Sequence, residues 1–169
     1  MLRVTRLLGK MDTSIVAYHS SPESDITVFA PLSHFGTRQA AVARAQSSIR
    51  AGRTSTLYEA RLDLGSILRI SDLPLHESRT PLHSWLRLID HLHYDTMPAV
   101  LSDGERATIL AAAAPFGRNA HGGIAALVLT LIDHGIDTLA YVNLFEDAGS
   151  VSWIVLHPDR VSIIRRSAL

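Results

Sequence analysis

The sequence predicts an α+β fold, in which strands open and close the chain and helices fill its middle. β-forming residues gather before residue 71 and after residue 137, whereas apolar residues between 81 and 134 recur at the three- and four-residue steps of amphipathic helices. This order lacks the regular strand–helix alternation of a doubly wound parallel sheet. Neither G-x-G-x-x-G nor G-x-x-x-x-G-K-[ST] occurs, which counts against a dinucleotide fold of the Rossmann type.

The chain up to Ile70 is predicted to hold several short strands and one helix. Thr37 has the type and position of an N-cap for an alanine-rich helix from Arg38 to Gln46, and Gly52 is expected to stop it. Elsewhere, β-formers bounded by turn residues and a two-residue alternation of apolar side chains indicate strands. These strand segments are expected at residues 14–19, 26–29, 55–64 and 67–70.

Three helices are predicted in the middle of the chain. Pro81 is a favourable first-turn residue, Ser102 or Asp103 can cap the second helix, and Gly135 is placed to follow the third. The helices are expected at about residues 81–93, 103–114 and 122–134.

The tail returns to strands. They are expected at residues 138–142, 151–156 and 161–164. Trp153 is expected in the core, because its neighbours Ile154, Val155 and Leu156 are typical of a fully buried strand.

Length and composition indicate one domain spanning residues 1–169. Sixteen Lys and Arg balance sixteen Asp and Glu, so no overall positive charge attracts the chain to nucleic acid or to an anionic membrane. The chain has no cysteine, which excludes disulfides, thiolate zinc sites and cysteine nucleophiles.

No targeting or membrane-spanning segment is expected. Arg3, Arg6 and Lys10 interrupt the apolar residues at the start, and the most apolar stretch, Ile124–Ile132, is about half as long as a bilayer requires. We therefore expect a cytoplasmic protein without a membrane partner, or one delivered into a target cell by a leaderless route.

The histidines and serines do not form a metal site or a hydrolase triad by their spacing. His91 and His93 would leave different sides of a helix, and His83 lies two turns before His91, so no three converge and no metal is expected. The Ser-His pairs lack the Gly-x-Ser-x-Gly setting of a nucleophile elbow.

A purely structural role poorly explains three polar motifs in the sequence. The first, Tyr18-His19-Ser20-Ser21, ends the first strand, and the second, Ser33-His34-Phe35-Gly36-Thr37, lies at a strand-to-helix turn. The third is the polar loop from Asn143 to Trp153, which contains Glu146 and Asp147 and is closed by an apolar strand.

In their order and spacing these motifs resemble the ADP-ribosyltransferase fold, the group that includes the diphthamide-directed toxins and the poly-ADP-ribose polymerases. That group has a first strand ending in Tyr-His-Gly-Thr or Tyr-His-Gly-Ser, a strand-to-helix turn, and a late strand with a catalytic carboxylate near its start. More narrowly, residues 15–64 and 136–166 resemble small bacterial and phage-encoded proteins of this fold.

The resemblance implies split antiparallel β-sheets, with the helical middle at about 81–134 as an insertion, and NAD as the cofactor. The catalytic residues that it implies are Glu146, His34 and Asp147. The cofactor-binding residues that it implies are Tyr18, His19, Ser20, Phe35, Gly36, Thr37 and Ser152.

Besides Ser20, which stands where the family motif has glycine, two positions depart from the family pattern. His34 stands where the family usually has tyrosine, and Ser152 stands where polymerase-like members have glutamate before the aromatic residue of the late strand. The carboxylate must therefore come from Glu146 or Asp147 in the preceding loop, or the transferase activity is lost. In an extended segment adjacent side chains leave opposite faces, and the longer reach of Glu146 favours it over Asp147.

The residue types suit this chemistry. A carboxylate stabilises the positive charge that develops on the ribose when the bond to nicotinamide breaks. A neutral His19 can both donate and accept a hydrogen bond, and a helix that starts at Thr37 points free N–H groups at a phosphate.

We therefore expect an NAD-dependent ADP-ribosyltransferase that modifies a macromolecule, protein rather than nucleic acid. The resemblance implies a toxin, effector or phage-borne modifier with a protein inhibitor or immunity partner. The alternative is a catalytically silent domain of the same fold that binds NAD, ADP-ribose or a protein. Purely structural interpretations of these residues also remain open. The Glu146-Asp147 loop can be an acidic hairpin, and His19 and His34 can be hydrogen-bonded turn residues.

Overall fold

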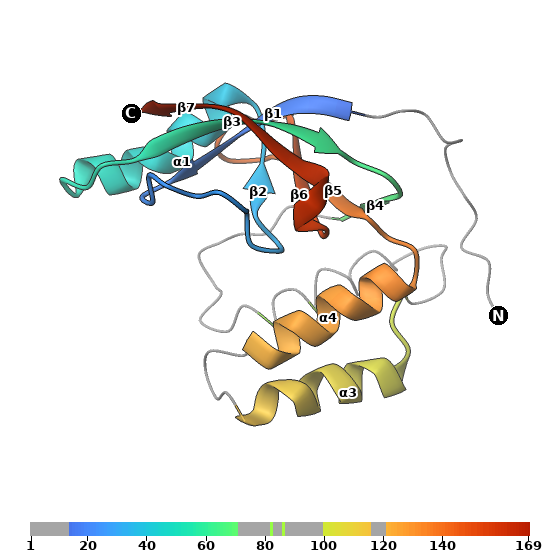
Figure 1. Ribbon diagram of the computed structural model, residues 1–169. Coiled ribbons are helices and arrows are strands. Elements are labelled where there is room, and N and C mark those ends of the chain that lie inside the picture. The colour runs from blue at the N-terminus through green and yellow to red at the C-terminus, as the bar shows by residue number, and fades with distance from the viewer. Residues whose placement is uncertain (1–13, 71–81, 83–85, 87–99, 116–120) are drawn as a thin grey trace.

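The computed structural model describes residues 14–70, 82, 86, 100–115 and 121–169, and these form three layers (Figure 1). One sheet lies at one side of the molecule, a second sheet lies in the middle, and two long helices cover the other side. The α+β prediction with two sheets is confirmed. In chain order the elements are β1 (Ser14–Ser21), β2 (His34–Phe35), α1 (Arg38–Arg50), β3 (Thr56–Asp63), β4 (Ile67–Arg69), α3 (Asp103–Ala113), α4 (His121–Asp133), β5 (Thr138–Val142), β6 (Val151–Val155), the 3-10 turn Pro158–Arg160 and β7 (Val161–Ala168).

The first sheet is antiparallel throughout, with the strand order β1-β3-β7. The second sheet has the order β2-β6-β5-β4, and it departs from the prediction because β4 and β5 run parallel. The reason lies in the chain between these two strands. A parallel pair requires a long crossover, and the helical middle supplies it.

A pair of backbone hydrogen bonds joins the two sheets. The N–H of Tyr18 donates to the carbonyl of Gly36 over 2.8 Å, and the N–H of Gly36 donates to the carbonyl of Tyr18 over 2.9 Å. Glycine suits this point, because a Cβ at residue 36 would lie 3.2 Å from Oγ of Ser152. The first and second polar motifs are therefore brought together.

Two apolar cores hold the layers. The core between the sheets includes Phe29, Phe35, Tyr58 and Val155, whereas Leu139 and Ile154 face α3 and α4. The middle sheet is thus covered on both faces, which explains why β5 is almost wholly buried.

Several local predictions are confirmed. Thr37 caps α1, since its hydroxyl accepts from the N–H of Ala40 over 3.1 Å, and Ser102 caps α3 in a capping box with Glu105. α4 ends two residues before Gly135, which has a φ of 76°. The helix expected at 81–93 lies outside the described residues, apart from Leu82 and Leu86.

One strand prediction is wrong, and one core prediction is confirmed only in part. Residues 26–29 form a loop rather than a strand, because the buried hydroxyl of Tyr58 donates to the carbonyl of Glu23 and accepts from the N–H of Ile26. Trp153 packs against the core between the sheets as expected, but it is half-buried rather than fully buried. Within the described parts of the chain, no helix is long and apolar enough to cross a bilayer.

Replacing Gly123 by Ala is expected to destabilise the protein by about 1–3 kcal/mol, as for other overpacked sites. A Cβ there would clash with the side chain of Leu82, and it would lie 2.7 Å from Cβ of Ala113 and 3.1 Å from the carbonyl oxygen of Ile109. Urea unfolding measures the effect. Gly104→Ala in α3 is the control, because its Cβ would meet nothing closer than 4.0 Å. If both variants were equally stable, α3 and α4 would not pack this closely.

Candidate functional site

A pocket of about 270 Å³, part of it open to solvent, lies beside the hydrogen-bonded junction of the two sheets. It draws residues from β1, β2, α1 and β5, from the loop after β5, and from β6. Its lining comprises Tyr18, His19, Ser20, His34, Phe35, Gly36, Ala40, Ala41, Arg44, Tyr141, Asn143, Glu146 and Ser152.

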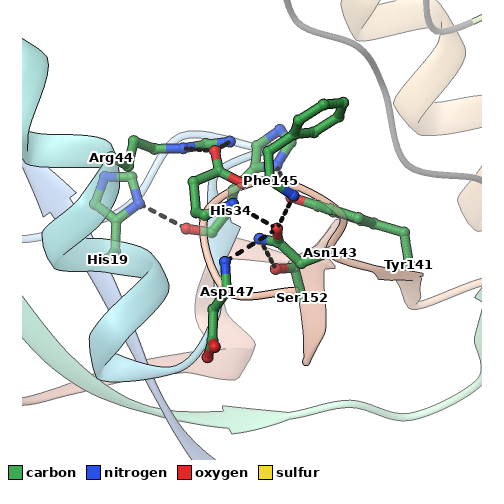
Figure 2. Close-up of polar contacts among 9 residues, drawn as sticks. His19, His34, Arg44, Tyr141, Asn143, Phe145, Asp147 and Ser152 are labelled. Carbon is green, nitrogen blue, oxygen red and sulfur yellow. Dashed lines mark hydrogen bonds and ion pairs between the residues drawn. The ribbon is translucent and has the colours of Figure 1, made fainter. Parts of the chain in front are cut away.

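His19 is held as a neutral donor and acceptor. Its Nδ1 lies 2.8 Å from the carbonyl oxygen of His34, so Nδ1 carries the proton and donates (Figure 2). Its ring packs against Phe29 and Phe35, with centroids 5.1 and 5.6 Å away. Burial and the positive charge of Arg44 lower the pKa of His19. Among the described residues no group pairs with Nε2, which is therefore an available acceptor.

His34 is also neutral. Its Nδ1 lies 2.8 Å from the hydroxyl oxygen of Tyr141, and the two rings meet edge to face. Burial, followed by the positive charge of Arg44 and by the nearby His19, lowers the pKa of His34 to about 3. The pocket thus contains two imidazoles that stay uncharged at neutral pH.

We expect His34 to make the protein less stable as the pH falls below about 6.5. Its pKa is about 3 in the folded chain against 6.5 in the unfolded chain, so between these values the unfolded chain binds the extra proton. The free energy of unfolding then falls by at most about 1.4 kcal/mol per pH unit. Urea unfolding between about pH 7 and 5 should give a shallower slope for His34→Gln than for wild type. Equal slopes would show that His34 titrates at its ordinary pKa.

Glu146 brings a carboxylate to the pocket. Both Nε and Nη2 of Arg44 donate to its Oε1, over 3.3 and 3.1 Å. The Glu146 side chain is 17% exposed and that of Arg44 is 32% exposed. Within the described part of the chain, no group pairs with the second oxygen, Oε2.

Asp147 and Thr37 lie together outside the lining. The Thr37 hydroxyl donates to Oδ2 of Asp147 over 2.5 Å, which puts this carboxylate beside the start of α1. The sequence predicts that a phosphate of the cofactor binds at the start of α1. A carboxylate at this point disfavours a phosphate beside it.

Asn143 organises the loop that carries both carboxylates. Its buried Oδ1 accepts from the N–H groups of Phe145, Glu146 and Asp147 over 2.9, 2.9 and 3.4 Å (Figure 2). Three consecutive N–H groups converge on one oxygen only in a tight turn. The expectation of an extended segment is therefore wrong, and the turn sends the two carboxylates to different partners.

Ser152 stands on β6 at the bottom of this loop. It is 3% exposed, and its Oγ accepts from Nδ2 of Asn143 over 3.4 Å. Ser152 thus brings a buried hydroxyl to the lining of the pocket.

The structure brings most of the predicted site residues together. Those in the lining are Tyr18, His19, Ser20, His34, Phe35, Gly36, Glu146 and Ser152, and those outside it are Thr37 and Asp147.

Sequence reasoning missed Arg44 and Tyr141 as pocket residues. For Arg44 a signal exists, because Ala40 and Ala41 share its helix face and let that face approach the sheet. Tyr141 has no such signal, since its partner His34 is 107 residues away along the chain.

Metal ligands do not gather in the described parts of the chain, where no group of three His, Asp or Glu side chains could hold an ion. His83, His91 and His93 lie outside the described residues.

No protein-family model matches the chain, and no curated protein sequence does. Among solved structures, it is similar to a chain in the crystal structure of the M. tuberculosis MbcT–MbcA toxin–antitoxin complex. The identity is 9% and the TM-score is 0.43, over 94% of this chain and 85% of that chain. At this level the likeness carries no argument about function.

Proposed function

We propose that this protein is an NAD-dependent ADP-ribosyltransferase, and that the pocket binds the nicotinamide and its ribose. The observation that carries the proposal is the meeting of two neutral imidazoles and one carboxylate in a single pocket. His19 and His34 come from two different sheets, and Glu146 comes from a loop more than a hundred residues further on. Polar groups that converge from distant elements are typical of binding sites.

The proposed reaction breaks the bond between the ribose and the nicotinamide ring. Nicotinamide leaves with the electron pair of that bond, and positive charge develops on the ribose. Oε2 of Glu146 stabilises this charge, or it orients a nucleophile of the acceptor that attacks the same ribose carbon and passes its proton to Oε2. Nε2 of His19 accepts a hydrogen bond from a ribose hydroxyl, because its Nδ1–H is already engaged.

The pocket holds only part of the dinucleotide. Its space of about 270 Å³ includes open solvent, so the enclosed part is smaller still and cannot hold a whole dinucleotide. Asp147 beside the start of α1 disfavours a phosphate there, so the diphosphate and the adenosine of NAD lie outside the pocket.

One specific observation favours a second candidate, a silent domain that binds NAD, ADP-ribose or a protein. Ser152 leaves β6 without the strand glutamate of polymerase-like proteins, and the carboxylate that is present is ion-paired to Arg44. Incubation with labelled NAD separates the two functions. Release of nicotinamide, or label on a macromolecule, supports the transferase; tight binding without turnover supports the silent domain.

The biological setting that we propose is a toxin, effector or phage-borne modifier that acts on a protein and is held inactive by a protein inhibitor. Its basis is the motif resemblance in residues 15–64 and 136–166. Induced expression of wild type in a bacterial host, with Glu146→Gln as the control, tests it. Growth arrest with wild type alone supports a toxic activity, and equal growth contradicts it.

His19→Ala is expected to weaken NAD binding by about 1.5–3 kcal/mol, the cost of losing a hydrogen bond in a desolvated site. Calorimetric titration measures the affinity. His134→Ala is the matched control, because His134 pairs with Glu105 and does not line the pocket. If the His19 and His134 variants bind NAD equally well, His19 does not hold the ribose.

A further inference from the structure

The carboxylate of Glu146 is held from two sides. Its own backbone N–H donates to Oδ1 of Asn143 over 2.9 Å, which fixes the main chain of the loop. The far end of the side chain is fixed separately by Arg44, which reaches across from α1. The loop and α1 are 102 residues apart along the chain, so only the fold brings these two groups together.

The geometry of the ion pair is one-sided. Two nitrogens of one guanidinium converge on Oε1, whereas a paired fork would use both carboxylate oxygens. This arrangement fixes the direction of the carboxylate and leaves Oε2 for another partner. Because Glu146 and Arg44 both line the pocket, Oε2 is available where a ligand would lie.

We propose that Arg44 is the positioning residue of this site, an inference that rests on the proposed function. Arg44 aims the Glu146 carboxylate at the ribose and does not itself bind NAD. Arginine suits this task better than lysine, because its planar fork fixes an orientation as well as a charge. The same charge contributes to the neutral state of both pocket histidines, since it lowers the pKa of His19 and of His34.

Other residues of α1 do not share this role. Ala40 and Ala41 line the pocket without polar side-chain atoms, and Arg50, at the end of the helix, donates to Gln46 one turn earlier. Arg50→Gln is therefore a matched control for Arg44→Gln, with the same change on the same helix at a distance from the pocket.

The kinetic test compares NAD turnover by wild type, Arg44→Gln, Arg44→Lys and Arg50→Gln. A positioning role predicts that Arg44→Gln lowers kcat at least about tenfold with KM within about threefold, and that Arg44→Lys recovers part of the loss. Arg50→Gln should behave as wild type. In the Glu146→Gln background, Arg44→Gln should cause no further loss, because the group through which it acts is gone.

Two kinetic results would overturn the inference. A rise in KM with kcat unchanged would show that Arg44 binds NAD directly. Losses that multiply in the Arg44→Gln, Glu146→Gln double variant would show that the two residues act independently.

Thermal melting of the same single and double variants tests the ion pair without an activity assay. The change in Tm of the double variant should be smaller than the sum of the two single changes, and strictly additive changes would show that the pair does not form. Non-additive melting together with no NAD turnover in wild type would contradict the proposed function and with it the role of Arg44, while leaving the ion pair in place. Turnover in wild type that survives Arg44→Gln would contradict the role of Arg44 alone.

Discussion

Replacing Glu146 by Gln is expected to reduce NAD turnover by about two to three orders of magnitude, the loss typical of removing one group that stabilises charge in the transition state. Glutamine keeps the length of the side chain and an oxygen for Arg44, but it has no negative charge to offer the ribose. The stability of the fold should change by less than about 1 kcal/mol, because the ion pair is partly exposed. Nicotinamide release measures the activity, and a melting curve of the same sample checks the fold.

Asp147→Asn is the matched control for that variant. It makes the same chemical change one residue further on, at a carboxylate that contacts Thr37 instead of the pocket. Activity should be retained, and Tm should fall slightly because the hydrogen bond from Thr37 weakens. Loss of activity in Asp147→Asn alone would reverse the assignment, and full activity in both variants would favour the silent domain.

The second large effect is expected from Asn143→Ala, which should destabilise the protein by about 2–3 kcal/mol and abolish NAD turnover. The buried Oδ1 of Asn143 is the acceptor for three partly buried backbone N–H groups, and a donor costs about 1–3 kcal/mol only when it is fully buried and left without a partner, so each of these three costs less. Exposed Leu144 and Phe145 let water reach part of the loop, which keeps the loss at the lower end. Without this turn Glu146 no longer has a defined place.

Asn143→Asp separates the two roles of this side chain. Aspartate loses the amino group that donates to Ser152 and adds a negative charge, but it keeps an oxygen for the three N–H groups, which stabilise that charge. It should therefore recover most of the stability and part of the turnover. Urea unfolding and nicotinamide release on the same preparations measure both. If Asn143→Ala were as stable and as active as wild type, the turn would not depend on Asn143.

Much of the secondary structure could be predicted from the sequence, because it depends on interactions within a few residues. Thr37 caps α1 by reaching the N–H of residue 40, and Ser102 caps α3 with Glu105 in the same way. The alternation that predicts β3 likewise comes from neighbouring side chains. The wrong prediction at residues 26–29 has a distant cause, the hydroxyl of Tyr58 that holds the loop by its backbone.

The residues of the candidate site could be predicted from the sequence only in part. The motifs around His19, His34 and Glu146 were visible as polar residues at strand ends, and all three line the pocket. For Arg44 the two alanines on its helix face predict only a close approach to the sheet, and its partner Glu146 is set by the fold.

The sequence by itself therefore determined most of the strands and helices in the described parts of the chain, and which polar residues stand at their ends. Only the tertiary structure decided that Glu146 faces the pocket while Asp147 turns to Thr37, and that β4 pairs in parallel with β5. The physical reason is the distance along the chain over which each kind of interaction acts. Caps and periodicity act over one or two turns of chain, whereas the register of two sheets and the crossing of α1 are set by burying distant apolar side chains together.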